Sequence, residues 1–285
     1  MVDLAGRDGI RLAADADGPD DGPPALLFHG GGQTRHAWGT ALAAVASRGW
    51  SGRSIDLRGH GDSDWAPDGD YTLQAFAGDV VAIARACPRP PVLIGASLGG
   101  ISSLIAVGEI AGNELARAIV LVDIAPKVER EGVDKIGEFM KAHLDGFDDL
   151  EQVADAIAAF NPNRPRPTNL EGLKKNVRQG PDGRWRWHWD PRFVGGRFGS
   201  TDETRSNMTD PDKLGKAARN LTIPTLLVRG RMSDLLSEEG AQQLLELVPH
   251  AKFADIAGAG HMVVGDRNDA FNDAVLAFLD DLPPT

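Results

Sequence analysis

The chain has 285 residues, of which 42% are hydrophobic and 25% charged, a composition typical of a globular protein with a substantial buried core. Forty-one acidic residues against 30 basic ones give a formal net charge of −11, so we expect neither a nucleic-acid partner nor attraction to an anionic membrane. The single cysteine, Cys87, excludes an intrachain disulfide and a cysteine-based zinc site.

The first 125 residues alternate short apolar runs with helical patterns. Turn-forming residues separate these segments, and Thr72 is suited to cap the third of the predicted helices. Predicted strands are Val2–Ala5, Ile10–Ala14, Ala25–Phe28, Gly52–Leu57, Pro91–Gly95 and Ala118–Val122; predicted helices are Ala37–Ser47, Leu73–Cys87 and Leu98–Glu109.

The pattern is interrupted after residue 125 and resumes near residue 215. The interrupting stretch, 126–214, is more charged and predicts two helices, near Val133–Leu144 and Leu150–Phe160, before a stretch rich in Pro, Asn, Arg and Gly. The chain then predicts strand Ile223–Arg229, helix Glu238–Leu247, strand Ala251–Ile256 and helix Asp269–Asp280. We expect a doubly wound, mostly parallel sheet formed by residues 1–125 and 215–285, with 126–214 inserted as a mainly helical cap.

Residues Gly95–Gly99 form a G-x-S-x-G pentapeptide between a predicted strand and a predicted helix. At such a junction the glycines permit a tight, strained turn, and the hydroxyl of Ser97 projects clear of the sheet. The helix N-terminus also places a partial positive charge beside the reacting oxygen. We therefore predict that Ser97 is a nucleophile.

A serine nucleophile needs a base, and the base needs an acid that orients it. His261 follows the last predicted strand in a glycine-rich loop, and Asp234 follows the strand before it. Both positions are at carboxyl ends of strands, where open α/β sheets assemble their sites. Our prediction is a Ser97–His261–Asp234 triad, with Asp123 as the alternative acid because it also ends a strand.

Acyl transfer also requires backbone amides that bind the developing oxyanion. We expect one from Leu98, next to the nucleophile, and one from the glycine run after Phe28, where Gly31 is favoured and Gly32 is the alternative. The sequence has no metal-binding pattern, no dinucleotide loop and no phosphate loop. We therefore expect a catalyst that uses neither a metal nor a cofactor.

These motifs together resemble the α/β-hydrolase superfamily, nearest to its small serine esterase and cofactor-free peroxidase-like branch. The resemblance is carried by His29–Gly32, Asp56–Ser63, Gly95–Gly99, Asp234 and His261, and covers roughly residues 20–125 and 220–280. It implies an eight-stranded α/β-hydrolase sheet. Serine at position 97, where the dehalogenase and epoxide-hydrolase branches carry aspartate, argues against those two chemistries.

The resemblance and the triad together imply hydrolysis of a carboxylic ester, or a similar acyl bond, through an acyl-enzyme on Ser97. Perhydrolysis of haloperoxidase type and carbon–carbon bond hydrolysis use the same triad and remain alternatives, and a ligand-binding receptor is a remote one. We expect a small-molecule acyl substrate and no membrane association. Because there is no secretory signal pattern and no apolar run near the ~18 residues that span a bilayer, we also expect a cytoplasmic protein, monomeric or homodimeric.

The predicted cap contains three tryptophans at alternate positions, Trp185, Trp187 and Trp189. In an extended segment the three indoles share one face. They either fill the core of the cap or wall an apolar substrate pocket over Ser97, since such pockets are lined mainly by aromatic and apolar side chains.

Overall fold

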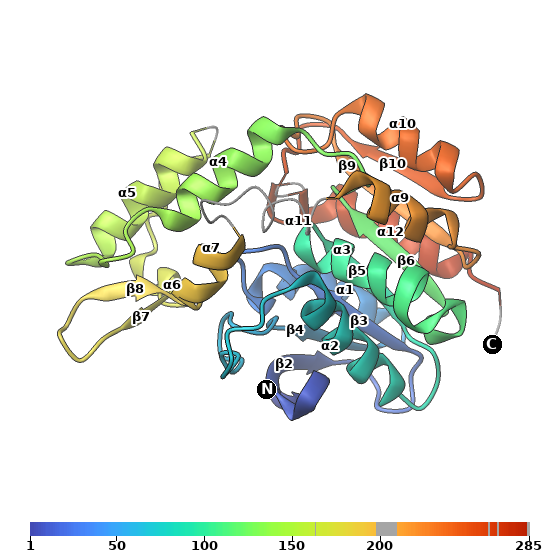
Figure 1. Cartoon of the computed structure of the whole chain (residues 1–285), viewed down its shortest axis with the longest axis horizontal. Coiled ribbons are helices and arrows are strands. Elements are labelled where there is room, and N and C mark those ends of the chain that lie inside the picture. Colours follow the sequence, from blue (N-terminus) through green and yellow to red (C-terminus); the bar gives the residue numbers. More distant parts are fainter. Residues whose placement is uncertain (163, 198–209, 262, 267, 284–285) are drawn as a thin grey trace.

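The computed structural model describes residues 1–162, 164–197, 210–261, 263–266 and 268–283. Eight strands form one sheet in the order β1-β2-β4-β3-β5-β6-β9-β10 (Figure 1). The strands are β1 (Val2–Ala5), β2 (Arg11–Asp17), β3 (Pro24–Phe28), β4 (Ser51–Ile55), β5 (Val92–Ala96), β6 (Ala118–Val122), β9 (Thr225–Gly230) and β10 (Lys252–Ile256).

Only β2 runs against its neighbours: it pairs antiparallel with β1 and β4, and every pairing from β4 to β10 is parallel. In the parallel strands, successive side chains enter different cores. Leu93 of β5 joins the core on one face, whereas Val92 and Ile94 join the core on the other. Both faces of the central strands β3, β5 and β6 are therefore buried, which explains why these three strands are almost continuously apolar.

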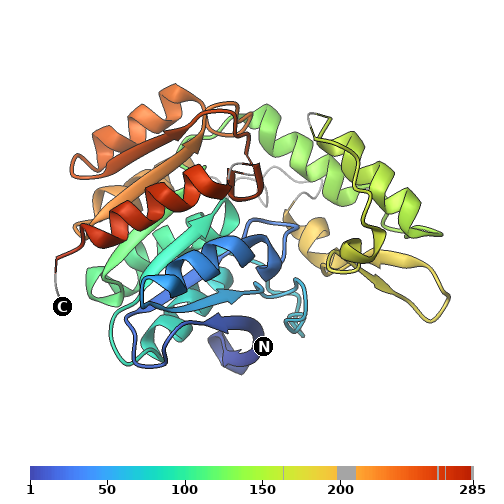
Figure 2. The same cartoon turned by 180° about the vertical axis from the view of Figure 1, so that it is seen from behind.

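Helices cover both faces of the sheet. The helices α2 (Leu73–Arg85), α3 (Leu98–Ile105), α9 (Pro211–Arg219) and α10 (Glu238–Leu247) contribute to the first core, and α1 (Gly39–Ser47) and α12 (Asn268–Asp280) pack together over the second (Figures 1 and 2). Thr72 caps α2 as expected, since its hydroxyl accepts a hydrogen bond from the amide of Ala75. The short helical turns are η1 (Arg7–Gly9), η2 (Arg35–Trp38), η3 (Ala106–Ala111, a π-helical continuation of α3), η4 (Asn113–Leu115) and α11 (Val263–Asp266).

The segment between β6 and α9 adds no strand to the eight-stranded sheet among its described residues, and it lies at one end of that sheet, toward the left in Figure 1. Its buried side chains, including Met140 and Trp189, are nevertheless continuous with the first core. Its elements are α4 (Arg130–Lys141), α5 (Leu150–Phe160), α6 (Leu170–Leu173), the antiparallel pair β7 (Val177–Gln179) and β8 (Trp185–Trp187), and α7 (Pro191–Arg197).

The expected α/β-hydrolase architecture, a mostly parallel eight-stranded sheet with helices on both sides, is confirmed. Helix α9, which packs on the core, begins at Pro211, four residues before the boundary expected at residue 215. This helix packs so closely on η3 that a Cβ at Gly108 would lie 2.2 Å from the carbonyl oxygen of Ala217. The sequence signal was present, because Asp210 caps the helix and Pro211 occupies its first turn.

Candidate active site

Ser97 lies at the sharp turn between β5 and α3 with φ +45° and ψ −111°, a strained conformation for a residue with a side chain. The turn is possible because a Cβ at Gly95 would lie 2.5 Å from the amide of Gly100, and one at Gly99 would lie 2.2 Å from the carbonyl oxygen of Phe28. Only glycine fits at these two positions. The local structure therefore matches the strand–helix elbow expected from the pentapeptide.

Ser97 and His261 line the same cavity, whose volume is about 420 Å³. Among the described residues no hydrogen bond joins their side chains, but catalytic hydrogen bonds are often long before substrate binds. The cavity lies between the core and the inserted segment, and apolar side chains from both line most of it: Ile101, Ile124, Val128, Val133, Ile136, Phe139, Met140, Ile157, Phe160, Trp187, Trp189, Leu235 and Val264.

The carboxylate that contacts His261 belongs to Asp123, at the end of β6. Its Oδ2 lies 2.7 Å from His261 Nδ1. Asp123 is fully buried and adopts φ +50°, and it also accepts hydrogen bonds from the amide of Gly230 at 2.9 Å and the hydroxyl of Ser233 at 2.5 Å. These three donors satisfy the buried carboxylate and orient it toward the imidazole.

The expectation that Asp234 orients His261 does not fit this geometry. The Asp234 carboxylate is about half exposed and forms an ion pair with Lys135 of α4 at 2.8 Å. Partial burial raises its pKa, but the Lys135 ammonium outweighs this and leaves the pKa below its usual value. The loop after β9 instead supports Asp123, through Gly230 and Ser233, so the carboxylate that contacts His261 comes from the neighbouring strand.

The glycine run after β3 forms a tight turn at the cavity. The carbonyl of Gly30 accepts a hydrogen bond from the amide of Gln33 at 3.1 Å, and Gly32 has φ +76°, as a type II turn requires at its third position. Gly30 is adjacent to Ser97, since a Cβ there would lie 3.3 Å from Ser97 Cβ. Within the described part of the chain, the amides of Gly31 and Leu98 donate to no protein atom, whereas that of Gly32 donates to His60.

The three tryptophans separate into two groups. Trp187 and Trp189 line the cavity with their rings stacked 4.9 Å apart, and both are buried. Trp185 is half-buried outside the cavity lining, where the Lys174 ammonium lies over its ring. Trp187 and Trp189 therefore belong to the buried core and also line the cavity, so the two alternatives do not exclude each other for these residues.

Arg164 and Lys175, both from the inserted segment, are the charged side chains that accompany His36 and His261 in the cavity lining. Among its described lining residues there is no Asp or Glu. The charged side chains among these described lining residues are thus basic, whereas the whole chain is acidic, a contrast that sequence composition could not have revealed.

Among the described residues, no group of three or more His, Cys, Asp or Glu side chains is placed to hold a metal ion. The same residues contain no helix long and apolar enough to cross a membrane.

Comparison with known proteins places the site in a family. Esterase Rv0045c of Mycobacterium tuberculosis is 27% identical over 90% of this chain and 83% of its own length. The 2-(acetamidomethylene)succinate hydrolase of Mesorhizobium japonicum is 27% identical over 95% of this chain and 92% of its own, and non-heme chloroperoxidase CPO-A1 of Kitasatospora aureofaciens is 27% identical over 96% and 97%. A crystal structure of E-2-(acetamidomethylene)succinate hydrolase superposes with a TM-score of 0.83 over 98% of this chain and 99% of that one, at 25% identity.

These relatives support a hydrolase that acts on esters. The model of the alpha/beta hydrolase family matches residues 25–274, which is most of the chain. Together with the sheet order and the serine elbow, this match shows that the chain belongs to the α/β-hydrolase family.

Proposed function

We propose that the protein is a serine esterase that forms an acyl-enzyme on Ser97. The observation that carries the proposal is the strained Ser97 in the same cavity as His261, whose other ring nitrogen is bound by the buried carboxylate of Asp123. In this arrangement His261 removes the proton of Ser97, and Asp123 holds the tautomer that allows it. His261 then protonates the leaving alcohol, and water removes the acyl group by the same route.

Two backbone amides bind the oxyanion in this proposal, those of Gly31 and Leu98. Both are without a protein acceptor in the described residues, and they come from the two loops that meet at Ser97. Because Gly32 already donates to His60, Gly31 is the better candidate of the two glycines. Each such donor contributes ~10²–10³ to the rate in other acyl-transfer enzymes.

The inserted segment serves as a cap in this proposal, because its apolar side chains form the outer wall of the cavity. The apolar lining suits an acyl or alcohol group of several carbons, and the basic side chains of Arg164 and Lys175 favour neutral or anionic esters over cationic ones.

Covalent labelling tests the nucleophile. A fluorophosphonate should modify Ser97, and Ser97→Ala should lose p-nitrophenyl ester hydrolysis by several orders of magnitude. Ser102→Ala is a matched control, since this buried hydroxyl on α3 bonds to the carbonyl of Leu98 and does not line the cavity. Labelling elsewhere, with activity surviving in Ser97→Ala, would exclude the proposal.

Perhydrolysis is the second candidate, favoured by the similarity to CPO-A1 over nearly the full length of both chains. It keeps the acyl-enzyme and replaces water by hydrogen peroxide. Assaying peracid formation from a short carboxylic acid beside ester hydrolysis separates the two activities, and ester turnover without peracid would eliminate this candidate.

A further inference from the structure

Three buried histidines lie where the inserted segment meets the core: His29 after β3, His60 after β4 and His188 after β8. The ring of His60 lies between the other two, 5.3 Å from that of His29 and 5.8 Å from that of His188, measured between ring centroids. None of the three has a role in the chemistry proposed above.

His188 and His60 bind the backbone of Gly32, in the glycine turn after β3, at its carbonyl oxygen and its amide respectively. The amide of Gly61 donates to His188 Nδ1 at 2.8 Å, and His188 Nε2 lies 3.3 Å from the carbonyl oxygen of Gly32. The amide of Gly32 in turn donates to His60 Nε2 at 3.2 Å, and His60 Nδ1 lies 3.0 Å from the carbonyl oxygen of Arg58.

These contacts determine the protonation of both rings. A ring nitrogen that accepts from a backbone amide carries no proton, so the other nitrogen is the donor to a carbonyl. His188 is therefore the neutral Nε2–H tautomer and His60 the neutral Nδ1–H tautomer. Burial also lowers the pKa of His188 well below its ordinary value.

His29 completes the arrangement from the other side of the turn. The amide of Leu57 donates to His29 Nε2 at 3.0 Å, which leaves a proton on Nδ1 for the carbonyl of Gly30 at 2.7 Å. That carbonyl belongs to the same planar trans peptide as the amide of Gly31, so the two point in opposite directions. Fixing the Gly30 carbonyl therefore fixes the direction of the Gly31 amide.

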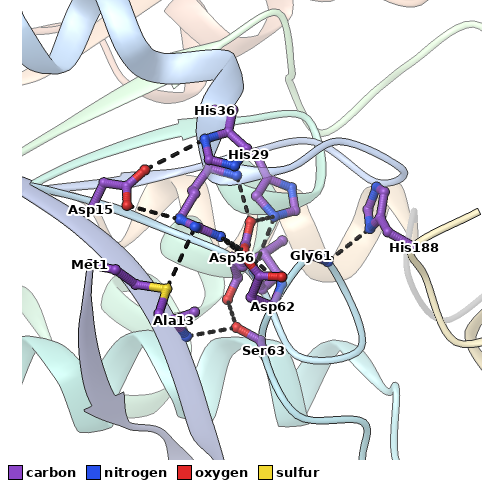
Figure 3. A network of polar contacts seen from close by, with 12 residues as sticks. Met1, Ala13, Asp15, His29, His36, Asp56, Gly61, Asp62, Ser63 and His188 are labelled. Atoms are coloured by element: carbon purple, nitrogen blue, oxygen red, sulfur yellow. Dashed lines mark hydrogen bonds and ion pairs between the residues drawn. The ribbon is translucent and has the colours of Figure 1, made fainter. Parts of the chain in front are cut away.

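The partner of His188 in the core is itself rigid. Gly61 has φ +56° and lies against Asp56, because a Cβ there would fall 2.1 Å from Asp56 Oδ2. Asp56 is fully buried and accepts from the Asp62 amide and the Arg35 guanidinium. Figure 3 shows Asp56 within this network and His188 reaching Gly61 from the side of the inserted segment.

The chain on either side of His188 is also tied to the core. The amide of Asp190 donates to the carbonyl of Gly59 at 2.9 Å, and its carboxylate accepts from the hydroxyl of Tyr71 at 2.5 Å. Arg178 of β7 forms an ion pair with Asp62 at 2.6 Å. The backbone at His188 is thus anchored on both sides, which fixes the position of its ring.

We propose that His188 is a positioning residue through which the inserted segment holds the oxyanion-binding turn. The Nε2–H of His188 binds the Gly32 carbonyl. Together with His60, His188 keeps Gly31–Gly32 in the type II conformation that presents the Gly31 amide to the cavity. The inference rests on the proposed role of Gly31 in binding the oxyanion. Without the contact to the Gly32 carbonyl, the turn is held only through Gly30 and the Gly32 amide. The Gly31 amide then faces the cavity only part of the time, so loss of this contact lowers kcat more than it changes KM.

Three substitutions separate the two hydrogen bonds of His188. Gln places an amide donor near the position of Nε2 and keeps the bond to Gly32, whereas Asn places an acceptor near Nδ1 and keeps only the bond from Gly61. Phe fills the space with neither. We expect His188→Gln to retain kcat within about threefold, and His188→Asn and His188→Phe to lose at least about tenfold in kcat with KM changed less than twofold.

Active sites are counted by fluorophosphonate titration, so that kcat refers to folded enzyme. His250→Gln is the matched control, since His250 is exposed, contacts the backbone carbonyl of Ile223 and does not line the cavity. Equal losses in all three His188 variants, or kcat within threefold of the unsubstituted enzyme in all three, would overturn the proposal. Absence of Ser97 labelling in the unsubstituted enzyme would instead refute the proposed function.

A measurement on the unsubstituted protein keeps the inference testable if the variants fail to fold. Long-range ¹H–¹⁵N correlation spectra distinguish the histidine tautomers, and at pH 7 we expect Nδ1–H for His29 and His60 but Nε2–H for His188. An Nδ1–H tautomer or a charged imidazolium at His188 would contradict the proposed contact with Gly32.

Discussion

Replacement of Asp123 by Asn tests the assignment of the acid. Its Oδ1 accepts from the Gly230 amide, and its Oδ2 accepts from Ser233 and contacts His261. If the Asn nitrogen takes the place of Oδ1, it faces the Gly230 N–H, and two donors oppose each other in a buried site. The nitrogen therefore takes the place of Oδ2 and donates to His261 Nδ1.

That orientation forces the proton of the neutral imidazole onto Nε2, the atom that must accept the proton of Ser97. In serine proteases the equivalent change lowers kcat by ~10⁴. We expect a similar loss for Asp123→Asn, which corresponds to ~5.4 kcal/mol of transition-state stabilisation. The active-site fold should persist, because the Asn oxygen still accepts from the Gly230 amide, and the Ser233 hydroxyl, unlike a backbone amide, can turn its proton away from the Asn nitrogen.

Asp234→Asn is the matched control. It removes an exposed ion pair with Lys135, and such pairs contribute ~0–1 kcal/mol to stability. Its kcat for p-nitrophenyl esters should stay within about threefold of the unsubstituted enzyme. A loss of ~10⁴ in Asp234→Asn together with near-normal turnover in Asp123→Asn would refute the reasoning from the hydrogen bonds.

Trp187→Ala should change the ratio of kcat/KM between short and long p-nitrophenyl esters, because one methylene in a fitted pocket is worth ~1–3 kcal/mol. Trp185→Ala, outside the cavity lining, should leave that ratio unchanged. Equal effects of the two substitutions would contradict a wall role for Trp187. Lys175→Glu should lower kcat/KM for an anionic hemisuccinate ester relative to a neutral ester of equal length, by about fivefold at low salt and less at high salt. Lys174→Glu should leave this ratio of kcat/KM values unchanged. An unchanged ratio in Lys175→Glu would show that Lys175 does not contribute to substrate binding. Stability should fall as the pH drops below ~6.5, because burial lowers the pKa of His29 to about 4 and that of His188 well below its ordinary value, so that the unfolded chain binds more protons. The slope is up to ~1.4 kcal/mol per pH unit for each of these two histidines. Urea unfolding between pH 7 and pH 5 measures this slope, and a pH-independent free energy of unfolding would show that the histidines are not neutral in the folded state.

Much of the fold follows from local patterns in the sequence. Continuous apolar runs predicted the buried parallel strands, since both faces of the sheet are covered, and β6, α5 and α10 have the predicted bounds. The G-x-S-x-G motif predicted the elbow because only glycine permits the close approaches at Gly95 and Gly99. These features depend on neighbours along the chain, which a sequence specifies directly.

The partner of His261 was decided by tertiary structure alone. Asp123 and Asp234 follow strands β6 and β9, which are adjacent in the sheet, so the sequence places both carboxylates at the same edge. The positive φ of Asp123 turns its side chain toward His261, while a lysine on α4, in the inserted segment, pairs with Asp234. The contact between His188 and Gly32 likewise depends on tertiary structure, because it joins residues 156 positions apart. Such contacts depend on how the inserted segment packs on the core, because spacing along the chain carries no information about which side chains meet across that boundary.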